Sequence, residues 1–230
     1  MIRFLIMTKK KTEDQHILNK TEEDFDINSV FYDDEPIEKH KAMIESVDTY
    51  AENLLPTPPK NTSDLTRLEL SHLQNVTGDL SEAERSLVET VDKDSRNLFK
   101  IYAKEKGLDL PKDFMDDVFE KTDPITLKLK YHFKRARPEQ IAEKMGFDVD
   151  VITTNSHQTP AYPSGHQTQA SLTALAMIDR FPQYEEDFRK MEDMVGRARI
   201  LQGVHYPSDN QAGKVLARKL WDELKSKQNE

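Results

Sequence analysis

The sequence predicts an all-α protein with an extension at its N-terminal end. Apolar residues recur at helical spacing through most of the chain, and helix start and stop signals separate the periodic segments. Strand signals are few, and no internal repeat is found. The chain has 230 residues, which is enough for one domain with a substantial core.

The N-terminal part divides into an arm and the start of a helical domain. Residues 1–36 are polar, rich in acidic residues and without a clear period, so we expect an acidic arm that is extended or partly disordered. The helical domain is expected over residues 37–230. Its first helix covers about 37–54, and a Pro-rich break follows at 55–63.

Capping signals mark the next helices. Ser63 and Asp64 favour a helix start, and Ser81 with Glu84 forms a capping box that opens a long helix. Gly107 is expected to end that helix.

The rest of the chain continues in the same way. Pro111 suits the first turn of another helix, whereas residues 147–155 can be read as a short strand or as a loop. Further helices are expected at about 124–136, 139–145, 165–181, 184–202 and 207–227.

Composition limits the class of protein. Charged residues make up 33% of the chain, the mean hydropathy is -0.76, and no apolar run reaches the roughly 20 residues of a membrane helix. The first residues lack the apolar core and cleavage site of a secretory signal, and there is no cysteine. We therefore expect a soluble, cytoplasmic protein without a membrane span.

Charge indicates the kind of partner. The net charge of -9 disfavours a nucleic acid polymer, because phosphate backbones attract basic surfaces. Residues 128–137 nevertheless hold five basic residues and no acidic one. A basic pocket in an acidic protein predicts a small anionic ligand.

Three short stretches carry the chemistry, and the first is KYHFKRARP at 130–138. Lys130, Lys134 and Arg137 are spaced to share one face of a helix that must end before Pro138. The alternative for this stretch alone is a solvated basic face.

The second stretch is PSGH at 163–166, directly before an Ala- and Leu-rich helix. Gly165 allows the backbone to approach a ligand, and free N–H groups at a helix start favour an anion. His166 would then lie at the mouth of an anion site. The alternative is a turn followed by a surface histidine.

The third stretch is RILQGVHYPSD at 199–209. Asp209 can accept a hydrogen bond from one ring nitrogen of His205, which fixes the tautomer and frees the other nitrogen for attack. Arg199 lies on the preceding helix. The alternative is an aspartate that stabilises a helix start beside an unrelated histidine.

In their order and spacing the three stretches resemble the motifs of the type 2 phosphatidic acid phosphatase superfamily. Soluble bacterial acid phosphatases, membrane lipid phosphatases and vanadium haloperoxidases share these motifs. The resemblance spans residues 130–209 and implies a single helical bundle domain. The chain departs at Ala198, where the family usually has a serine.

The resemblance also implies roles for individual residues. His205 would be the nucleophile that forms a phosphohistidine, Asp209 would orient it, and His166 would be the general acid and base. The substrate phosphate would be held by Lys130, Arg137, Ser164, Gly165 and Arg199. The implied reaction is metal-independent hydrolysis of phosphate monoesters or terminal phosphoryl groups, with no cofactor and with vanadate binding as a phosphate mimic. The expected partner is a small phosphorylated substrate, and a homodimer is possible.

Two alternative functions stay open. A vanadium-dependent haloperoxidase is favoured by the stretch PAYPSGH and disfavoured by the short chain. A noncatalytic phosphate- or nucleotide-binding protein with a decayed site is favoured by Ala198 alone.

Overall fold

The all-α prediction is confirmed. The computed structural model describes residues 26–32, 35–154 and 157–228, and over these residues it contains helices, no strand and one isolated β-bridge between Phe31 and Arg135. Residues 1–25 of the expected arm lie outside the described residues.

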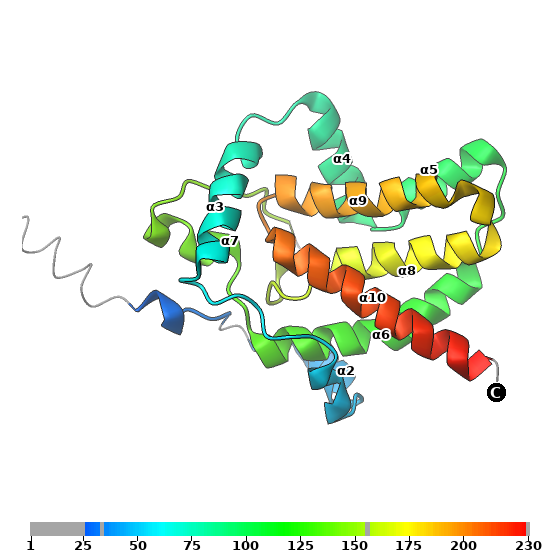
Figure 1. Cartoon of the computed structure of the whole chain (residues 1–230), viewed down its shortest axis with the longest axis horizontal. Coiled ribbons are helices and arrows are strands. Elements are labelled where there is room, and N and C mark those ends of the chain that lie inside the picture. Colours follow the sequence, from blue (N-terminus) through cyan, green and yellow to red (C-terminus); the bar gives the residue numbers. More distant parts are fainter. Residues whose placement is uncertain (1–25, 33–34, 155–156, 229–230) are drawn as a thin grey trace, which may run out of the picture.

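Three long helices near the C-terminal end form the centre of the molecule. Helix α8 (Gly165–Arg180) packs along both α9 (Glu185–Leu201) and α10 (Pro207–Gln228), and α6 (Lys112–Phe133) packs against α8 (Figure 1). The three motifs lie at the end of α6, at the start of α8 and at the junction of α9 and α10. The packing of these helices therefore brings the motifs together.

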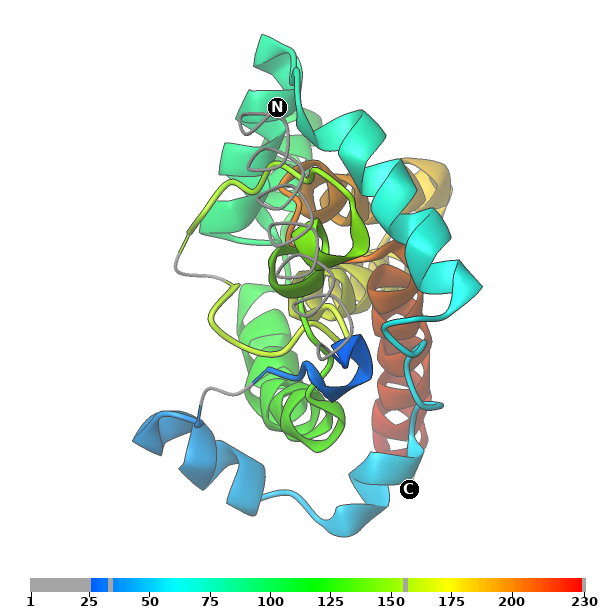
Figure 2. The ribbon, with the colours of Figure 1, turned by 90° about the vertical axis from the view of Figure 1, so that its left-hand side faces the viewer.

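The N-terminal helices surround this centre. Helices α3 (Asp64–Thr77), α4 (Glu82–Lys93) and α5 (Asn97–Lys106) pack on α9, whereas α2 (Glu38–Glu45) packs on α6 (Figures 1 and 2). Shorter helical segments connect these elements: η1 (Ile27–Ser29), η2 (Thr49–Asn53), α7 (Pro138–Ile141), η3 (Glu143–Met145) and η5 (Pro182–Tyr184).

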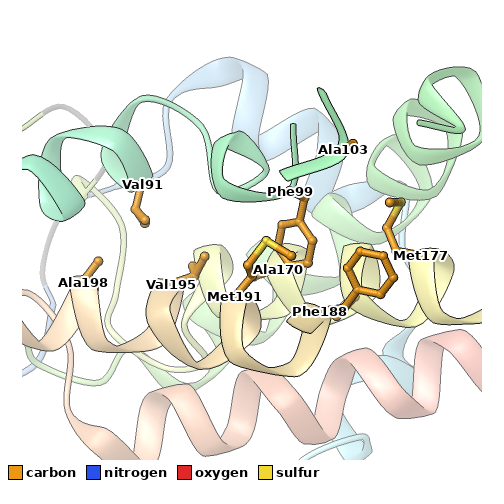
Figure 3. Packing of buried hydrophobic residues seen from close by; sticks show 10 residues of the cluster. Val91, Phe99, Ala103, Ala170, Met177, Phe188, Met191, Val195 and Ala198 are labelled. Carbon is orange, nitrogen blue, oxygen red and sulfur yellow. The ribbon is translucent and has the colours of Figure 1, made fainter. Parts of the chain in front are cut away.

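Apolar side chains between α4, α5, α8 and α9 form one of the cores. Phe99, Met177 and Phe188 are fully buried there and contribute large apolar surfaces (Figure 3). Ala198 is buried in the same cluster near Val91. A serine at position 198 would place its hydroxyl in this apolar environment.

A buried polar seam fixes how α8, α9 and α10 meet. Gln167 donates to the Ser171 hydroxyl, which donates to Glu192, and Asn210 donates to the carbonyl of Gly196. A Cβ atom added to Gly196 would lie 2.2 Å from Oε1 of Gln167. A side chain at this position would therefore displace the Gln167 amide from its place between α8 and α9.

The structure corrects several expected helix boundaries. The long helix expected after Ser81 is broken between α4 and α5, where the Asp94 side chain accepts from the backbone N–H of Arg96. Pro124 lies within the continuous helix α6, and residues 147–154 contain no strand. The apolar periodicity extends across the junction of α4 and α5 and across Pro124 in α6. It therefore does not show where a helix ends.

The described part of the arm packs on the helical body. The Asn61 amide donates to the carbonyls of Ile27 and Val30, and the Tyr32 N–H donates to the carbonyl of Lys134. Tyr32 is buried. In the described part of the chain, no helix has the length and apolar character needed to cross a membrane.

Candidate active site

The three motifs meet around one cavity of about 260 Å³. Each motif contributes to its inner wall: Lys130 and Arg137 from the first, Gly165 and His166 from the second, and His205 from the third. The complete lining is Lys39, His40, Met43, Asp123, Thr126, Leu127, Lys130, Arg137, Thr159, Gly165, His166, Gln169 and His205.

His205 is held by a carboxylate behind it. Its Nδ1 lies 3.1 Å from Oδ2 of Asp209, and both residues are buried. An ionised carboxylate only accepts hydrogen bonds, so Nδ1 carries the proton and the Nε2 lone pair is left available. Burial and the cation Arg137, whose Nη1 lies 3.5 Å from Nε2, lower the pKa of His205 well below its ordinary value.

Asp209 stays ionised inside the protein. Burial alone would raise its pKa, but Arg135 and the hydrogen bond with His205 bring that pKa below its ordinary value. Asp209 lies in the first turn of α10, where a negative charge is also favoured by the helix dipole.

His166 lies in the first turn of α8. Its ring donates a hydrogen bond to the backbone carbonyl of Asp92. Burial, followed by the positive charge of Arg199, lowers the pKa of His166 to about 3. Without an anion in the cavity, His166 is therefore neutral at physiological pH.

Two cations of the first motif are oriented by backbone carbonyls. Nζ of Lys130 donates to the carbonyl of Pro160 at 2.5 Å, and Arg137 donates through Nε to the carbonyl of Thr159 at 2.8 Å. Burial lowers the pKa of Lys130 well below its ordinary value and that of Arg137 to about 10, and neighbouring cations act in the same direction. An anion in the cavity would relieve this repulsion.

Arg199 lies behind the cavity wall. Its side chain is fully buried, and its Nη1 donates to Oδ1 of Asp92 at 2.8 Å. The same carboxylate oxygen accepts from Gln202 and from the Thr154 hydroxyl. Asp92 therefore links the expected cation Arg199 to the expected acid His166.

Ser164 and Gly165 differ in what they offer a ligand. The Ser164 hydroxyl accepts from the backbone N–H of Gln167 and acts as the N-cap of α8, whereas Gly165 lines the cavity. The Ser164 N–H donates to the carbonyl of Asp209, which ties the start of α8 to that of α10.

The expected basic helix face is wrong. Helix α6 ends at Phe133, and Lys134 adopts a left-handed conformation with a φ of 46°. The chain then runs extended, so that Arg137 precedes α7 and reaches the cavity, whereas Lys134 is exposed. Pro138 does not set the end of α6, because the helix has stopped before it.

Sequence reasoning missed three charged residues that support the site. Arg135, one of the five basic residues of 128–137, is buried against Asp209, and Glu69 and Asp92 come from α3 and α4. The two carboxylates carry no local sequence signal. Arg135 stands between the exposed Lys134 and the buried Ala136, so its burial has no local sequence signal either.

The outer wall of the cavity is mixed in character. Lys39 and His40 come from α2, and Asp123 and Gln169 face the cavity from α6 and α8. Asp123 accepts a hydrogen bond from the Gln169 amide, and burial raises the pKa of its carboxyl.

Comparison with known families finds a matching family model. The model of the PAP2 superfamily matches residues 122–221, a stretch that contains all three motifs. Residues 122–221 are therefore similar to the PAP2 superfamily, whose model matches less than half of the chain. Glu69 and Asp92 lie outside the matched stretch.

Two curated proteins are similar to part of the chain. A lipid A 1-phosphatase of Rhizobium johnstonii is 33% identical over 42% of this chain and 38% of its own length. A lipid A 1-phosphatase of Rhizobium etli is 32% identical over 37% of this chain and 36% of its own length. The chain thus spans well under half the length of these relatives.

One solved structure shares the fold. A bacterial vanadium-dependent iodoperoxidase superposes with a TM-score of 0.57 at 18% identity, over 76% of this chain and 53% of its own. A transmembrane PAP2-type phosphatidylglycerolphosphate phosphatase from Bacillus subtilis gives a TM-score of 0.38 at 16% identity, over 83% of this chain and 82% of its own. At such identity the first likeness concerns the fold alone.

These relatives overturn the expected cytoplasmic location. The two curated relatives are phosphatases named for a lipid, lipid A. An acidic composition is a weak ground for predicting a location.

Proposed function

We propose that this protein is a phosphatase that hydrolyses phosphate monoesters through a phosphohistidine on His205. One observation carries the proposal. The imidazoles of His205 and His166 line the same cavity as the buried cations Lys130 and Arg137, and His205 is oriented through Nδ1 by Asp209. Nucleophile, acid and anion-binding charges are thereby in one place.

The first step transfers the phosphoryl group to the protein. Nε2 of His205 attacks phosphorus, the bond from phosphorus to the ester oxygen breaks, and His166 gives its proton to the departing oxygen. Lys130, Arg137 and, from behind, Arg199 stabilise charge on the phosphoryl oxygens.

The second step returns the protein to its starting state. His166, now neutral, takes a proton from water, the resulting hydroxide attacks phosphorus, and the bond to Nε2 of His205 breaks. Inorganic phosphate leaves, and the proton on His166 is available for the next turnover. The two steps need a neutral His205 and, at the start, a protonated His166. The negative charge of a bound phosphate favours the protonated form of His166.

The cavity and the curated relatives of the chain support a class of substrate. The residues of the inner wall would contact only a terminal phosphoryl group. Sugar phosphates, nucleotides, pyrophosphate and phospholipid headgroups share this group. Because the curated relatives are named lipid A 1-phosphatases, a lipid-linked phosphate presented in detergent micelles is the first natural substrate to test.

The decisive experiment measures phosphate release from p-nitrophenyl phosphate by the purified chain in the presence of EDTA. The wild type is compared with His205→Ala and with His132→Ala, a matched control whose side chain is 40% exposed and paired with Glu52. We expect turnover without metal in the wild type and the control, and none in His205→Ala. Vanadate is expected to inhibit competitively as a phosphate mimic.

Other outcomes select other functions. Phosphate binding without turnover in the wild type, across acidic to neutral pH, would support a noncatalytic binding protein. Oxidation of bromide by peroxide in the presence of vanadate, without phosphatase activity, would support a haloperoxidase.

A further inference from the structure

Arg135 is a buried arginine that does not line the cavity. It follows the end of α6 and lies two residues before Arg137, yet it is only 4% exposed. Burying a guanidinium is costly unless it is paired, so its partners indicate what it does.

All its side-chain partners lie behind the nucleophile. Nη1 donates to Oδ1 of Asp209 at 2.5 Å and to the Ser208 hydroxyl at 2.7 Å, and Nη2 donates to Oε2 of Glu69 at 3.2 Å. The guanidinium also stacks 4.0 Å from the centre of the Tyr206 ring. A planar group held at several points has one orientation.

The two oxygens of Asp209 have separate partners. Oδ1 accepts from Arg135, whereas Oδ2 accepts from Nδ1 of His205 at 3.1 Å and from the N–H of Tyr206 at 2.9 Å. Arg135 therefore fixes the rotation of the carboxylate without competing for the oxygen that faces the imidazole.

Glu69 of α3 closes the arrangement. Its Oε1 accepts from the N–H of Ser208 at 2.6 Å, and its Oε2 accepts from the Ser208 hydroxyl at 3.0 Å and from Arg135. One carboxylate thus holds both Arg135 and the first turn of α10, which carries Asp209.

We propose that Glu69 and Arg135 form a positioning relay that holds Asp209, and through it His205, in the orientation needed for attack. The relay deepens the proposed function, because it acts on the same nucleophile. Neither residue touches the substrate cavity, so both are positioning residues.

The relay also has an electrostatic consequence. The charged groups that face His205 are Arg137 from the segment before α7, Lys130 from α6 and Asp209 from α10. Arg135 offsets the negative charge of Asp209 from behind. Removing Arg135 should strengthen the pull of Asp209 on a proton at His205, and removing the charge of Glu69 should act in the opposite direction.

The test follows the His205 imidazole directly by NMR of ¹⁵N-histidine-labelled protein, with its signal assigned from a His205→Ala sample. The variants are Arg135→Met, Arg135→Lys and Glu69→Gln. Arg197→Met is the control, because Arg197 pairs with Glu84 at the exposed surface. In the wild type we expect the proton on Nδ1 at neutral pH.

The expected results differ in sign. Arg135→Met should raise the imidazole pKa of His205 by about one unit and mix the two tautomers. Glu69→Gln should lower the His205 pKa or leave it unchanged. The pKa in Arg135→Lys should lie between those of the wild type and Arg135→Met, and the pKa in the control should equal that of the wild type. In hydrolysis, Arg135→Met should lower kcat about a hundredfold with KM nearly unchanged, and Arg135→Lys should restore part of kcat.

The relay is overturned if folded Arg135→Met keeps the wild-type tautomer and titration. If Arg135→Met does not fold, Arg135→Lys and Glu69→Gln test the relay in its place. A rise of the His205 pKa in Glu69→Gln overturns the relay. Expected shifts in a wild type that hydrolyses nothing would leave the relay standing and refute the proposed phosphatase.

Discussion

The two histidines of the cavity are supported in different ways. His205 faces a carboxylate that is itself held by Arg135 and Glu69, so its tautomer and orientation are fixed. His166 donates a hydrogen bond to a backbone carbonyl, and its pKa is lowered by burial and by the cation Arg199. A nucleophile needs one fixed tautomer throughout the reaction, whereas an acid and base must change its protonation state.

The comparison shows how one site can keep two imidazoles in different states. A directional, charged partner fixes the tautomer of His205. His166 lacks such a partner among the described residues, so the charge of a bound anion controls its protonation. Four tests separate these two kinds of support.

The largest effect is expected on the His205 side. Asp209→Asn keeps the size of the side chain but removes the charge and allows the wrong imidazole tautomer, so we expect kcat to fall about a thousandfold or more. Steady-state kinetics on p-nitrophenyl phosphate measures it, with Asp193→Asn as the control because that aspartate is exposed on α9. A loss of less than tenfold would remove the orienting role of Asp209.

On the other side, the effect of His166→Ala should depend on the leaving group. An alkyl phosphate needs protonation of its departing oxygen, so its kcat should fall by about a hundredfold or more. p-Nitrophenolate leaves with little help, and its loss should be clearly smaller. Equal losses for both substrates would show that His166 is not the acid.

Asp92→Asn should affect binding more than chemistry. Arg199 would lose its ionic partner and His166 its nearby negative charge, so we expect affinity for inorganic phosphate to fall about tenfold. Isothermal titration calorimetry measures this affinity, with Asp116→Asn as the control. A large fall in kcat with unchanged phosphate affinity would contradict a role of Asp92 in phosphate binding.

The smallest effect concerns protonation itself. The pKa of His166 is about 3 without an anion, and a bound phosphate should raise it, so binding should take up part of a proton between about pH 4 and 6. Calorimetry in two buffers of different ionisation enthalpy detects the uptake. It should vanish in His166→Ala, and an unchanged uptake in that variant would place the titrating group elsewhere.

Much of the framework was readable from the sequence. Helical periodicity with caps such as Ser63 and Ser81 predicted an all-α chain, and both side chains cap as expected. The motifs predicted which residues would meet, and the structure places His205, His166, Lys130, Arg137 and Gly165 around one cavity. The catalytic roles assigned to them stay predictions until turnover is measured.

Helix ends limited what could be predicted. Lys130 and Arg137 were expected on one helix face, but the left-handed turn at Lys134 ends α6 earlier. After this turn the chain pairs with a distant segment through the bridge between Phe31 and Arg135, which the local sequence does not indicate.

The sequence by itself determined the helical class and the chemical groups of the site, because periodicity, caps and motif spacing are local properties. The tertiary structure decided which ordinary charges support those groups. Asp92 and Arg199 are 107 residues apart, and Glu69 and Arg135 are 66 apart. Among 42 acidic residues nothing local distinguishes these two, because a carboxylate becomes functional only when packing buries it beside a cation.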